Sequence, residues 1–144
     1  MNKVYVVDGA RTPFLKTRSE PGLFSASDLA VACARPVLAR QPFPASLLDE
    51  VIVGCVIPAA DEANIARLIA LRLGCGKRMP AHTVQRNCAS GLQAVATAAE
   101  RIALGRAQLV LAGGAEAMSR APVQWNPAMV GWLGKMLRAR HPLD

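Results

Sequence analysis

Cys88 is the residue of this chain whose surroundings best suit covalent chemistry. It stands in the stretch TVQRNCASGLQAVATAAERIALG, residues 83–105, where small residues lead into an alanine-rich helical pattern. The thiolate is the nucleophilic form of cysteine, and the N-terminal end of a helix dipole favours it. Ala89, Ser90 and Gly91 leave space for a substrate beside the sulfur. From this pattern alone two interpretations of Cys88 stay open: a small buried apolar side chain, or a nucleophile for acyl transfer whose own N–H could face the oxyanion.

The other three cysteines do not suggest a metal site. Cys33, Cys55 and Cys75 lie far apart in the sequence, and none belongs to a CxxC pair or has a histidine at ligand spacing. Cys33 and Cys55 fall inside apolar periodic segments and are predicted to be core residues. Cys75 stands between two glycines and is predicted to belong to a turn that ends a helix. We expect no metal and no permanently bound cofactor.

The remaining candidates for a catalytic role are two histidines and one carboxylate. A base for Cys88 would need its imidazole within hydrogen-bond reach of the thiol. His82 comes six positions earlier, in an extended stretch, and would lie about 20 Å away. His141 cannot be placed near Cys88, so we expect structural roles for both histidines. Glu116 follows a glycine pair and is predicted to be a buried capping or interface carboxylate.

The elements that position Cys88 alternate between strands and helices. Short apolar runs bounded by glycine or proline predict strands, and apolar residues at helical spacing predict helices between them. This order indicates a mostly parallel sheet covered by helices on both faces. The predicted strands are 4–7, 51–56, 81–86 and 107–114, and the predicted helices are 25–41, 61–76 and 89–104.

Two of these helices carry specific expectations. Ser25, Ser27 and Asp28 are capping residues at the start of the first helix, whereas Pro36 lies inside it and should kink or break it, at a cost of about 3 kcal/mol. The helix at 89–104 has few polar residues. It should therefore be buried between layers, with the free N–H groups of its first turn directed into the interior.

Composition indicates a globular protein and limits its partners. A chain of 144 residues can bury about two-thirds of its unfolded surface, and 52% hydrophobic with 19% charged residues excludes a disordered chain. The net charge of +7 favours anionic ligands in general. With only 4% aromatic residues and no basic run, the sequence does not support stacking on bases, so we expect no nucleic-acid partner.

Membrane association is not expected either. The N-terminus has no signal-peptide pattern and no apolar run approaches the roughly 20 residues that span a bilayer, which favours a cytoplasmic location. One alternative stays open for residues 129–140, MVGWLGKMLRAR, where Trp132 could lie on an apolar face beside basic residues such as Lys135. Such a face could bind a membrane surface peripherally, although packing inside a covering loop is the preferred interpretation.

Three stretches resemble one known family. GARTPF at residues 9–14, NCASGLQAV at 87–95 and AGGAEAMSRAP at 112–122 resemble, in order and spacing, the N-terminal half of thiolases, which are acyl-CoA acyltransferases. The resemblance implies an α/β, thiolase-like layered fold, in which the nucleophile helix is one of two buried central helices. The chain would supply an incomplete N-terminal half, with an α/β domain at 1–118 and the truncated start of a loop insertion at 119–144.

The resemblance also implies a reaction for Cys88. The sulfur would take an acyl group from an acyl-CoA as a thioester, and the group would pass to acetyl-CoA in a Claisen condensation. In the reverse direction CoA would cleave a 3-ketoacyl-CoA. Coenzyme A thioesters are thus the implied substrates and a homo-oligomer, dimer or tetramer, the implied assembly, while acyl chain length and reaction direction cannot be inferred from these residues.

Parts of the family pattern do not occur in this chain. The histidine of the Gly-His-Pro motif, the second catalytic cysteine and the Asn-Glu-Ala-type segment are absent, and RHPL at 140–143 comes too early and lacks the preceding glycine. The chain therefore resembles a fragment, which we expect to be inactive alone. Two alternatives stay open: a non-catalytic thiolase-like acyl-binding protein or subunit, and a relative of the ketoacyl synthases. GGAEAMS and ARTP favour thiolase over the latter.

Overall fold

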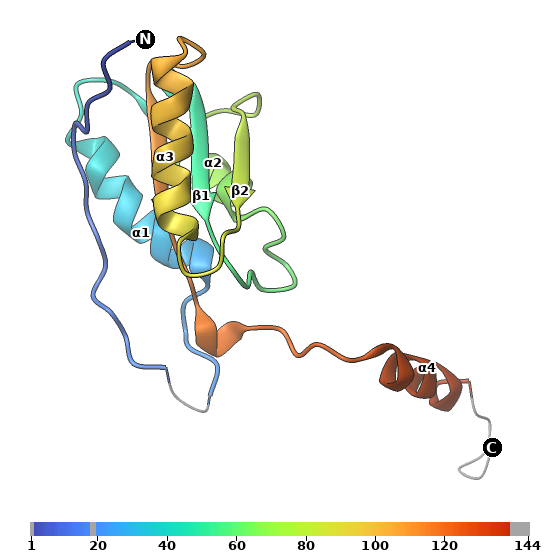
Figure 1. Cartoon of the computed structure of the whole chain (residues 1–144). Coiled ribbons are helices and arrows are strands. Elements are labelled where there is room, and N and C mark those ends of the chain that lie inside the picture. Colours follow the sequence, from blue (N-terminus) through green and yellow to red (C-terminus); the bar gives the residue numbers. More distant parts are fainter. Residues whose placement is uncertain (1, 18–19, 139–144) are drawn as a thin grey trace.

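A three-stranded parallel sheet forms the centre of the molecule (Figure 1). The computed structural model describes residues 2–17 and 20–138. The strands lie in the order β2-β1-β3, and Val51 of β1 is aligned with Ala81 of β2 and Leu111 of β3. This arrangement confirms the α/β prediction. The bounds are β1 Glu50–Gly54, β2 Ala81–Val84 and β3 Val110–Gly114.

Helices cover both faces of this sheet, because the buried central strand β1 presents apolar side chains to both. Val51 and Val53 belong to the larger core cluster, together with Ile65 and Ile69 of α2 (Ile65–Arg72). The intervening residue of β1, Ile52, packs on the opposite face with Ala94 and Ala98 of α3, as the alternation of side chains along a strand requires. The bounds of the other two covering helices are α1 Ala26–Ala39 and α3 Ser90–Ala103.

Helix α1 begins where the capping residues predict, but the expected break at Pro36 is absent. Ser25 and Asp28 form a capping box, in which each side chain accepts a hydrogen bond from the other residue's backbone N–H. The helix continues through Pro36 to Ala39, and the carbonyl of Pro36 still accepts from Arg40 N at 3.3 Å. Pro36 lies in the last turns, where packing of α1 against the core outweighs the loss of one N–H donor.

The strand predicted at residues 4–7 is wrong. In the part of the chain that the structure describes, this segment pairs with no strand, and the side chains of Val6 and Val7 are 87% and 71% exposed. A β-branched run forms a strand only where a neighbour supplies the ladder of hydrogen bonds. Here the ends of the segment are attached to helices instead: Asn2 N donates to Ala103 O at 3.0 Å, and Asp8 pairs with Arg40 at 3.0 Å.

Helix α3 is buried along one stripe only, so the predicted burial between two layers is not found in the described residues. Ser90, Ala94 and Ala98 face the sheet, whereas Leu92 is 73% exposed and Val95 is 41% exposed. Apolar residues lie around most of the circumference of α3, so a second layer could cover its outer side as well. Within residues 2–17 and 20–138, however, the sheet is the layer that packs against α3.

The chain leaves the sheet after β3 and continues as an extended arm. A short 3-10 turn, Met118–Arg120, is followed by α4, Pro127–Met136, which lies apart from the sheet (Figure 1). The helix begins with Asn126 as its cap and has no buried residue. None of the helices in the described residues combines the length and the apolarity needed to cross a bilayer.

Candidate active site

Cys88 lies at the tip of a tight turn between β2 and α3. Asn87 has a φ of 49°, a left-handed conformation that asparagine tolerates better than most residues. The buried Ser90 hydroxyl fixes the turn, because it accepts from Arg86 N at 2.8 Å and donates to Asn87 O at 2.7 Å. Ala89 N closes the turn by donating to Arg86 O. The Cys88 side chain is exposed, so the alternative of a buried apolar residue does not hold.

Three glycines bring the first turn of α3 into contact with the sheet. A methyl group on Gly54, at the end of β1, would lie 2.2 Å from the carbonyl carbon of Ser90, and one on Gly114 would lie 2.8 Å from Gly91 Cα. The close packing expected at Gly91 is thus confirmed, whereas the roles of Gly54 and Gly114 were not predicted. This contact places Cys88 at the carboxyl ends of the strands, the edge where parallel sheets bind ligands.

Cys88 lines an open groove of about 1650 Å³. Three parts of the chain form its walls: the turn at Cys88 with the start of α3, the segments that follow β1 and β3, and residues 10–17 and 20–24 with the first half of α1. A groove of this size exceeds the roughly 300–1,000 Å³ of most small-molecule sites. It can therefore receive an extended ligand whose reactive group lies at the sulfur.

Glu116 holds the segment after β1 in place. Its carboxylate accepts hydrogen bonds from Val56 N at 2.8 Å, Ile57 N at 3.1 Å and the Cys55 thiol at 3.4 Å, so the half-buried Glu116 binds a loop after β1 and caps no helix there. Burial, together with the negative charge of Glu116, raises the pKa of the Cys55 thiol to about 12. Cys55 therefore stays protonated at neutral pH, in agreement with the core role predicted for it.

His82 belongs to an ion-pair cluster away from Cys88. Its Nδ1 lies 3.2 Å from Glu50 Oε1, and Arg101 donates two hydrogen bonds to the same carboxylate at 2.9 and 3.0 Å. Glu50 begins β1, whereas Cys88 lies beyond the opposite ends of the strands. The structural role expected for His82 is confirmed, and His141 lies outside the described residues. Within residues 2–17 and 20–138, no group of three metal-ligating side chains occurs.

The Glu50 cluster gives the fold a specific pH dependence. Hydrogen bonds from Arg101 hold the pKa of Glu50 below its ordinary value of 4.5, although burial opposes them. A carboxylate with a lowered folded-state pKa stabilises the fold above its unfolded pKa and loses that contribution as the pH falls through the folded value. We expect Glu50→Gln to lower the free energy of unfolding by about 1–2 kcal/mol at neutral pH, a figure that allows for solvent screening of Arg101.

The difference between Glu50→Gln and the parent protein should shrink as the pH falls below 4.5, the ordinary pKa of glutamate, and should vanish once the pH is below the lowered folded-state pKa, where both carry a neutral side chain. Urea denaturation followed by circular dichroism at neutral and acidic pH measures it. A difference that stays constant across this range would show that the charge of Glu50 does not act as described.

Alkylation rates should separate the four cysteines. Cys88 is exposed, Cys33 is half-buried, and Cys55 and Cys75 are 2% and 3% exposed. Iodoacetamide reacts with accessible thiolates, so it should label Cys88 first and Cys55 and Cys75 last. Peptide mass spectrometry of timed samples gives the four rates, and equal labelling of all four thiols would contradict the geometry.

A sequence-family model for the thiolase N-terminal domain matches residues 4–138. The chain belongs to the thiolase family. Among its relatives, the β-ketoadipyl-CoA thiolase of Pseudomonas knackmussii is 43% identical over 99% of this chain, and the 3-ketoacyl-CoA thiolase of Bacillus subtilis is 39% identical over 85% of it. The β-subunit of the human mitochondrial trifunctional enzyme is 38% identical over 90%. This thiolase chain spans 40%, 32% and 27% of those three relatives.

Solved thiolase structures share the fold of this chain. The acetyl-CoA acetyltransferase of Bacillus anthracis is 39% identical, with a TM-score of 0.68 over 72% of this chain and 26% of its own length. A thiolase from Ascaris suum, crystallised with coenzyme A, is 30% identical, with a TM-score of 0.70 over 83% of this chain and 30% of its own. These matches confirm the family and the fold that the three motifs predicted.

Proposed function

We propose that Cys88 is the nucleophile of a thiolase reaction, in which it takes an acyl group from a coenzyme A thioester. One observation carries the proposal: in a chain of the thiolase family, an exposed thiol stands just before the first turn of α3 and opens on a groove large enough for an extended ligand. The relatives are named as thiolases of ketoacyl-CoA substrates, which supports this substrate class.

The first half-reaction transfers the acyl group to the protein. The Cys88 sulfur attacks the thioester carbonyl, a new carbon–sulfur bond forms at Cys88, and the bond to CoA breaks as the CoA sulfur takes up a proton. The oxyanion forms beside the turn that precedes α3, where the backbone N–H of Cys88 can stabilise it. Ser90 and Asn87 hold this turn through the hydrogen bonds described above, so they position the nucleophile.

The second half-reaction sets the direction. In synthesis, the α-carbon of acetyl-CoA attacks the acyl group on Cys88, a carbon–carbon bond forms and the thiol is released. In degradation, Cys88 attacks a 3-ketoacyl-CoA, acetyl-CoA leaves with a proton on its α-carbon, and CoA then removes the shortened acyl group. We assign the proton transfers to the family's histidine and second cysteine, whose motifs do not occur in these 144 residues.

Two further properties fit this proposal. The net charge of +7 favours association with the anionic phosphates of coenzyme A. Apolar side chains on the outer face of α3, such as Leu92 and Val95, are suited to burial in a larger assembly, in keeping with a homo-oligomer of two or four thiolase subunits.

The 144-residue chain alone is expected to show no thiolase turnover. The groove in its described part contains Cys88 but no histidine to accept the thiol proton. CoA-dependent loss of acetoacetyl-CoA absorbance measures turnover, and the polypeptide encoded by the whole gene serves as the comparison. We expect cleavage by the latter only. Cleavage by the 144-residue chain would contradict the assignment of the proton transfers.

The same assay separates catalysis from acyl binding. A thiolase-like binding protein would retain acyl-CoA in equilibrium dialysis but would neither cleave acetoacetyl-CoA nor become acylated at Cys88. If the polypeptide encoded by the whole gene binds acyl-CoA without either reaction, the non-catalytic alternative replaces the proposed function.

A further inference from the structure

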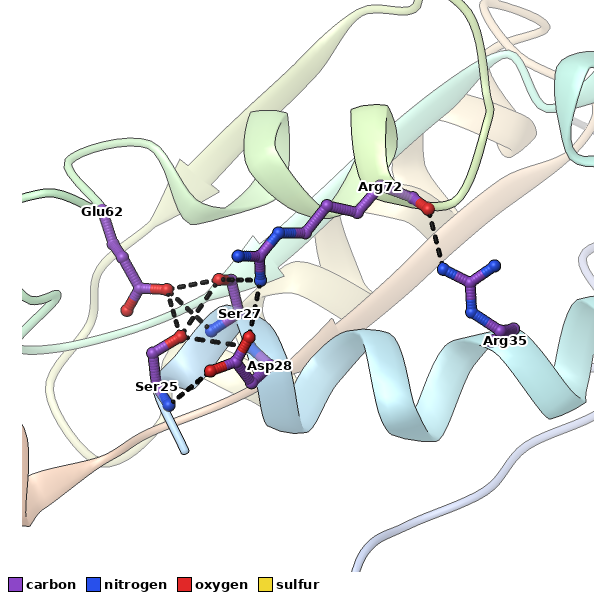
Figure 2. Close-up of polar contacts among 6 residues, drawn as sticks. All are labelled: Ser25, Ser27, Asp28, Arg35, Glu62 and Arg72. Carbon is purple, nitrogen blue, oxygen red and sulfur yellow. Dashed lines mark hydrogen bonds and ion pairs between the residues drawn. The ribbon is translucent and has the colours of Figure 1, made fainter. Parts of the chain in front are cut away.

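Glu62 binds the first turn of α1 from the loop between β1 and α2 (Figure 2). Its Oε1 accepts hydrogen bonds from Ser25 Oγ at 2.6 Å, from Ser27 N at 3.1 Å and from the Ser27 hydroxyl. Arg72 of α2 extends the network, because its guanidinium donates to Ser27 Oγ at 2.9 Å and to Asp28 at 2.8 Å. The start of α1 is therefore attached to the β1–α2 loop and to α2 through side chains.

This carboxylate is more deeply buried than a helix cap requires. Glu62 is 4% exposed, and its second oxygen, Oε2, has no hydrogen-bond partner among the described residues. Burial opposes its ionised form, but hydrogen bonds from Ser25 and Ser27 hold the pKa of Glu62 below its ordinary value. Ser25 and Asp28 already cap α1, so a buried charge with one unpaired oxygen is a costly addition if it only caps the helix.

The segments that Glu62 joins form one wall of the Cys88 groove. Leu23 and Phe24 line the groove immediately before Ser25, and Leu29 and Cys33 line it farther along α1. Residues 56–57 line it just before the loop that carries Glu62. Glu62 thus connects two parts of the groove wall while its own side chain lies outside the lining.

Other hydrogen bonds hold other parts of this wall: Arg35 of α1 donates to Arg72 O at 2.9 Å, and Glu116 holds residues 56–57. Residues 20–25, immediately before α1, have no regular secondary structure. Near α1 this segment is attached through Gly22, which accepts a hydrogen bond from Arg120 at 3.1 Å and donates to Ser119 Oγ at 3.0 Å. The network at Glu62 is therefore the buried attachment that fixes where this segment enters α1.

We propose that Glu62 is a positioning residue, which fixes the α1 wall of the groove and so controls how the acyl-CoA substrate fits, without taking part in the chemistry at Cys88. This inference rests on the proposed function, because it assigns acyl-CoA to the groove. It predicts that loss of the carboxylate weakens substrate binding and leaves the reaction of the bound substrate nearly unchanged.

The first test compares Glu62→Ala with Asp49→Ala in the polypeptide encoded by the whole gene. Asp49 is an exposed control: its carboxylate, like that of Glu62, accepts hydrogen bonds from a distant segment, here from Gln108 N at 2.7 Å and Leu109 N at 3.0 Å, but it does not line the groove. We expect Glu62→Ala to raise KM for acetoacetyl-CoA about tenfold and to change kcat less than about twofold, while Asp49→Ala changes neither. Glu62→Gln, which keeps one acceptor oxygen, should restore most of the parent KM.

An unchanged KM in Glu62→Ala, or a loss of kcat at unchanged KM, would overturn the inference. If both Ala variants raise KM equally, the effect is general destabilisation and the positioning role is likewise refuted.

A second test does not need turnover. In the 144-residue chain, Glu62→Ala should speed alkylation of Cys33 in α1 about tenfold and leave the rate at Cys88 unchanged, whereas Asp49→Ala should change neither rate. An unchanged rate at Cys33 would contradict the positioning role. If the polypeptide encoded by the whole gene fails to cleave any 3-ketoacyl-CoA, the proposed function fails, but the rate at Cys33 still decides whether Glu62 fixes the wall.

Discussion

Replacing Cys88 with alanine is expected to reduce thiolase turnover of the polypeptide encoded by the whole gene by at least about a thousandfold, because covalent acyl transfer then has no nucleophile. The Cys88 side chain is exposed and packs into no core cluster, so the free energy of unfolding should change by less than about 0.5 kcal/mol. Acetoacetyl-CoA cleavage and urea denaturation measure the two quantities on the same preparation.

Cys33→Ser is the control for Cys88→Ala. Cys33 also lines the groove, but it lies on α1 and is half-buried. The Cys33→Ser variant should retain turnover within a few-fold of the parent protein. Retained turnover in Cys88→Ala, or an equal loss in both variants, would remove Cys88 from the mechanism.

Replacing Gly54 with alanine is expected to be the most destabilising single change near the site. The added methyl would lie 2.2 Å from the carbonyl carbon of Ser90, 2.3 Å from its oxygen and 2.5 Å from Gly91 N. All three are backbone atoms of the first turn of α3, so no side-chain rotation relieves the clash. Helix and strand must separate, which we expect to cost about 3–5 kcal/mol, measured as a lower urea midpoint or as loss of soluble protein.

Gly91→Ala is the matched comparison on the facing element. Its methyl would lie 3.5 Å from Gly114 Cα, an ordinary contact, and alanine favours the helix by up to about 1 kcal/mol over glycine. Gly91→Ala should therefore unfold within about 1 kcal/mol of the parent protein. Equal stability of the two variants would show that α3 does not sit on β1 as described.

Local sequence signals predicted the elements that depend on local interactions. Ser25 and Asp28 cap α1 as their residue types indicate, and Gly74 and Gly76 have the positive φ values of the predicted turn around Cys75. The buried strand β1 also follows from its continuous apolar run. These features depend on neighbouring residues, and neighbouring residues can be read directly from a sequence.

Two predictions that depended on a particular partner element were wrong. Val4–Val7 have the composition of a strand, yet no strand pairs with them in the described part of the chain. The apolar residues around α3 predicted burial between two layers, but within the described residues only the sheet packs along it. Propensity and apolar character show that a segment can be buried or paired, and the layer that would do so is set by the rest of the fold.

The candidate site was predicted at Cys88 but not in its surroundings. Three features of these surroundings depend on the folded conformation. They are the hydrogen bonds of Ser90 within its turn, the close approach of α3 to Gly54 and Gly114, and the hydrogen bonds from α1 to Glu62. Single residue types such as serine, glycine or glutamate occur throughout the chain. Only the three-dimensional contacts distinguish these four from the others.

Trapping the acyl-enzyme tests the central assignment most directly. The polypeptide encoded by the whole gene is mixed with acetyl-CoA, quenched in acid and digested for peptide mass spectrometry. We predict one acetyl group on the peptide that contains Cys88, removable by hydroxylamine or added CoA and absent in Cys88→Ala. An acetyl group on a different residue, or turnover of acetoacetyl-CoA with no acetyl group on Cys88, would contradict the account.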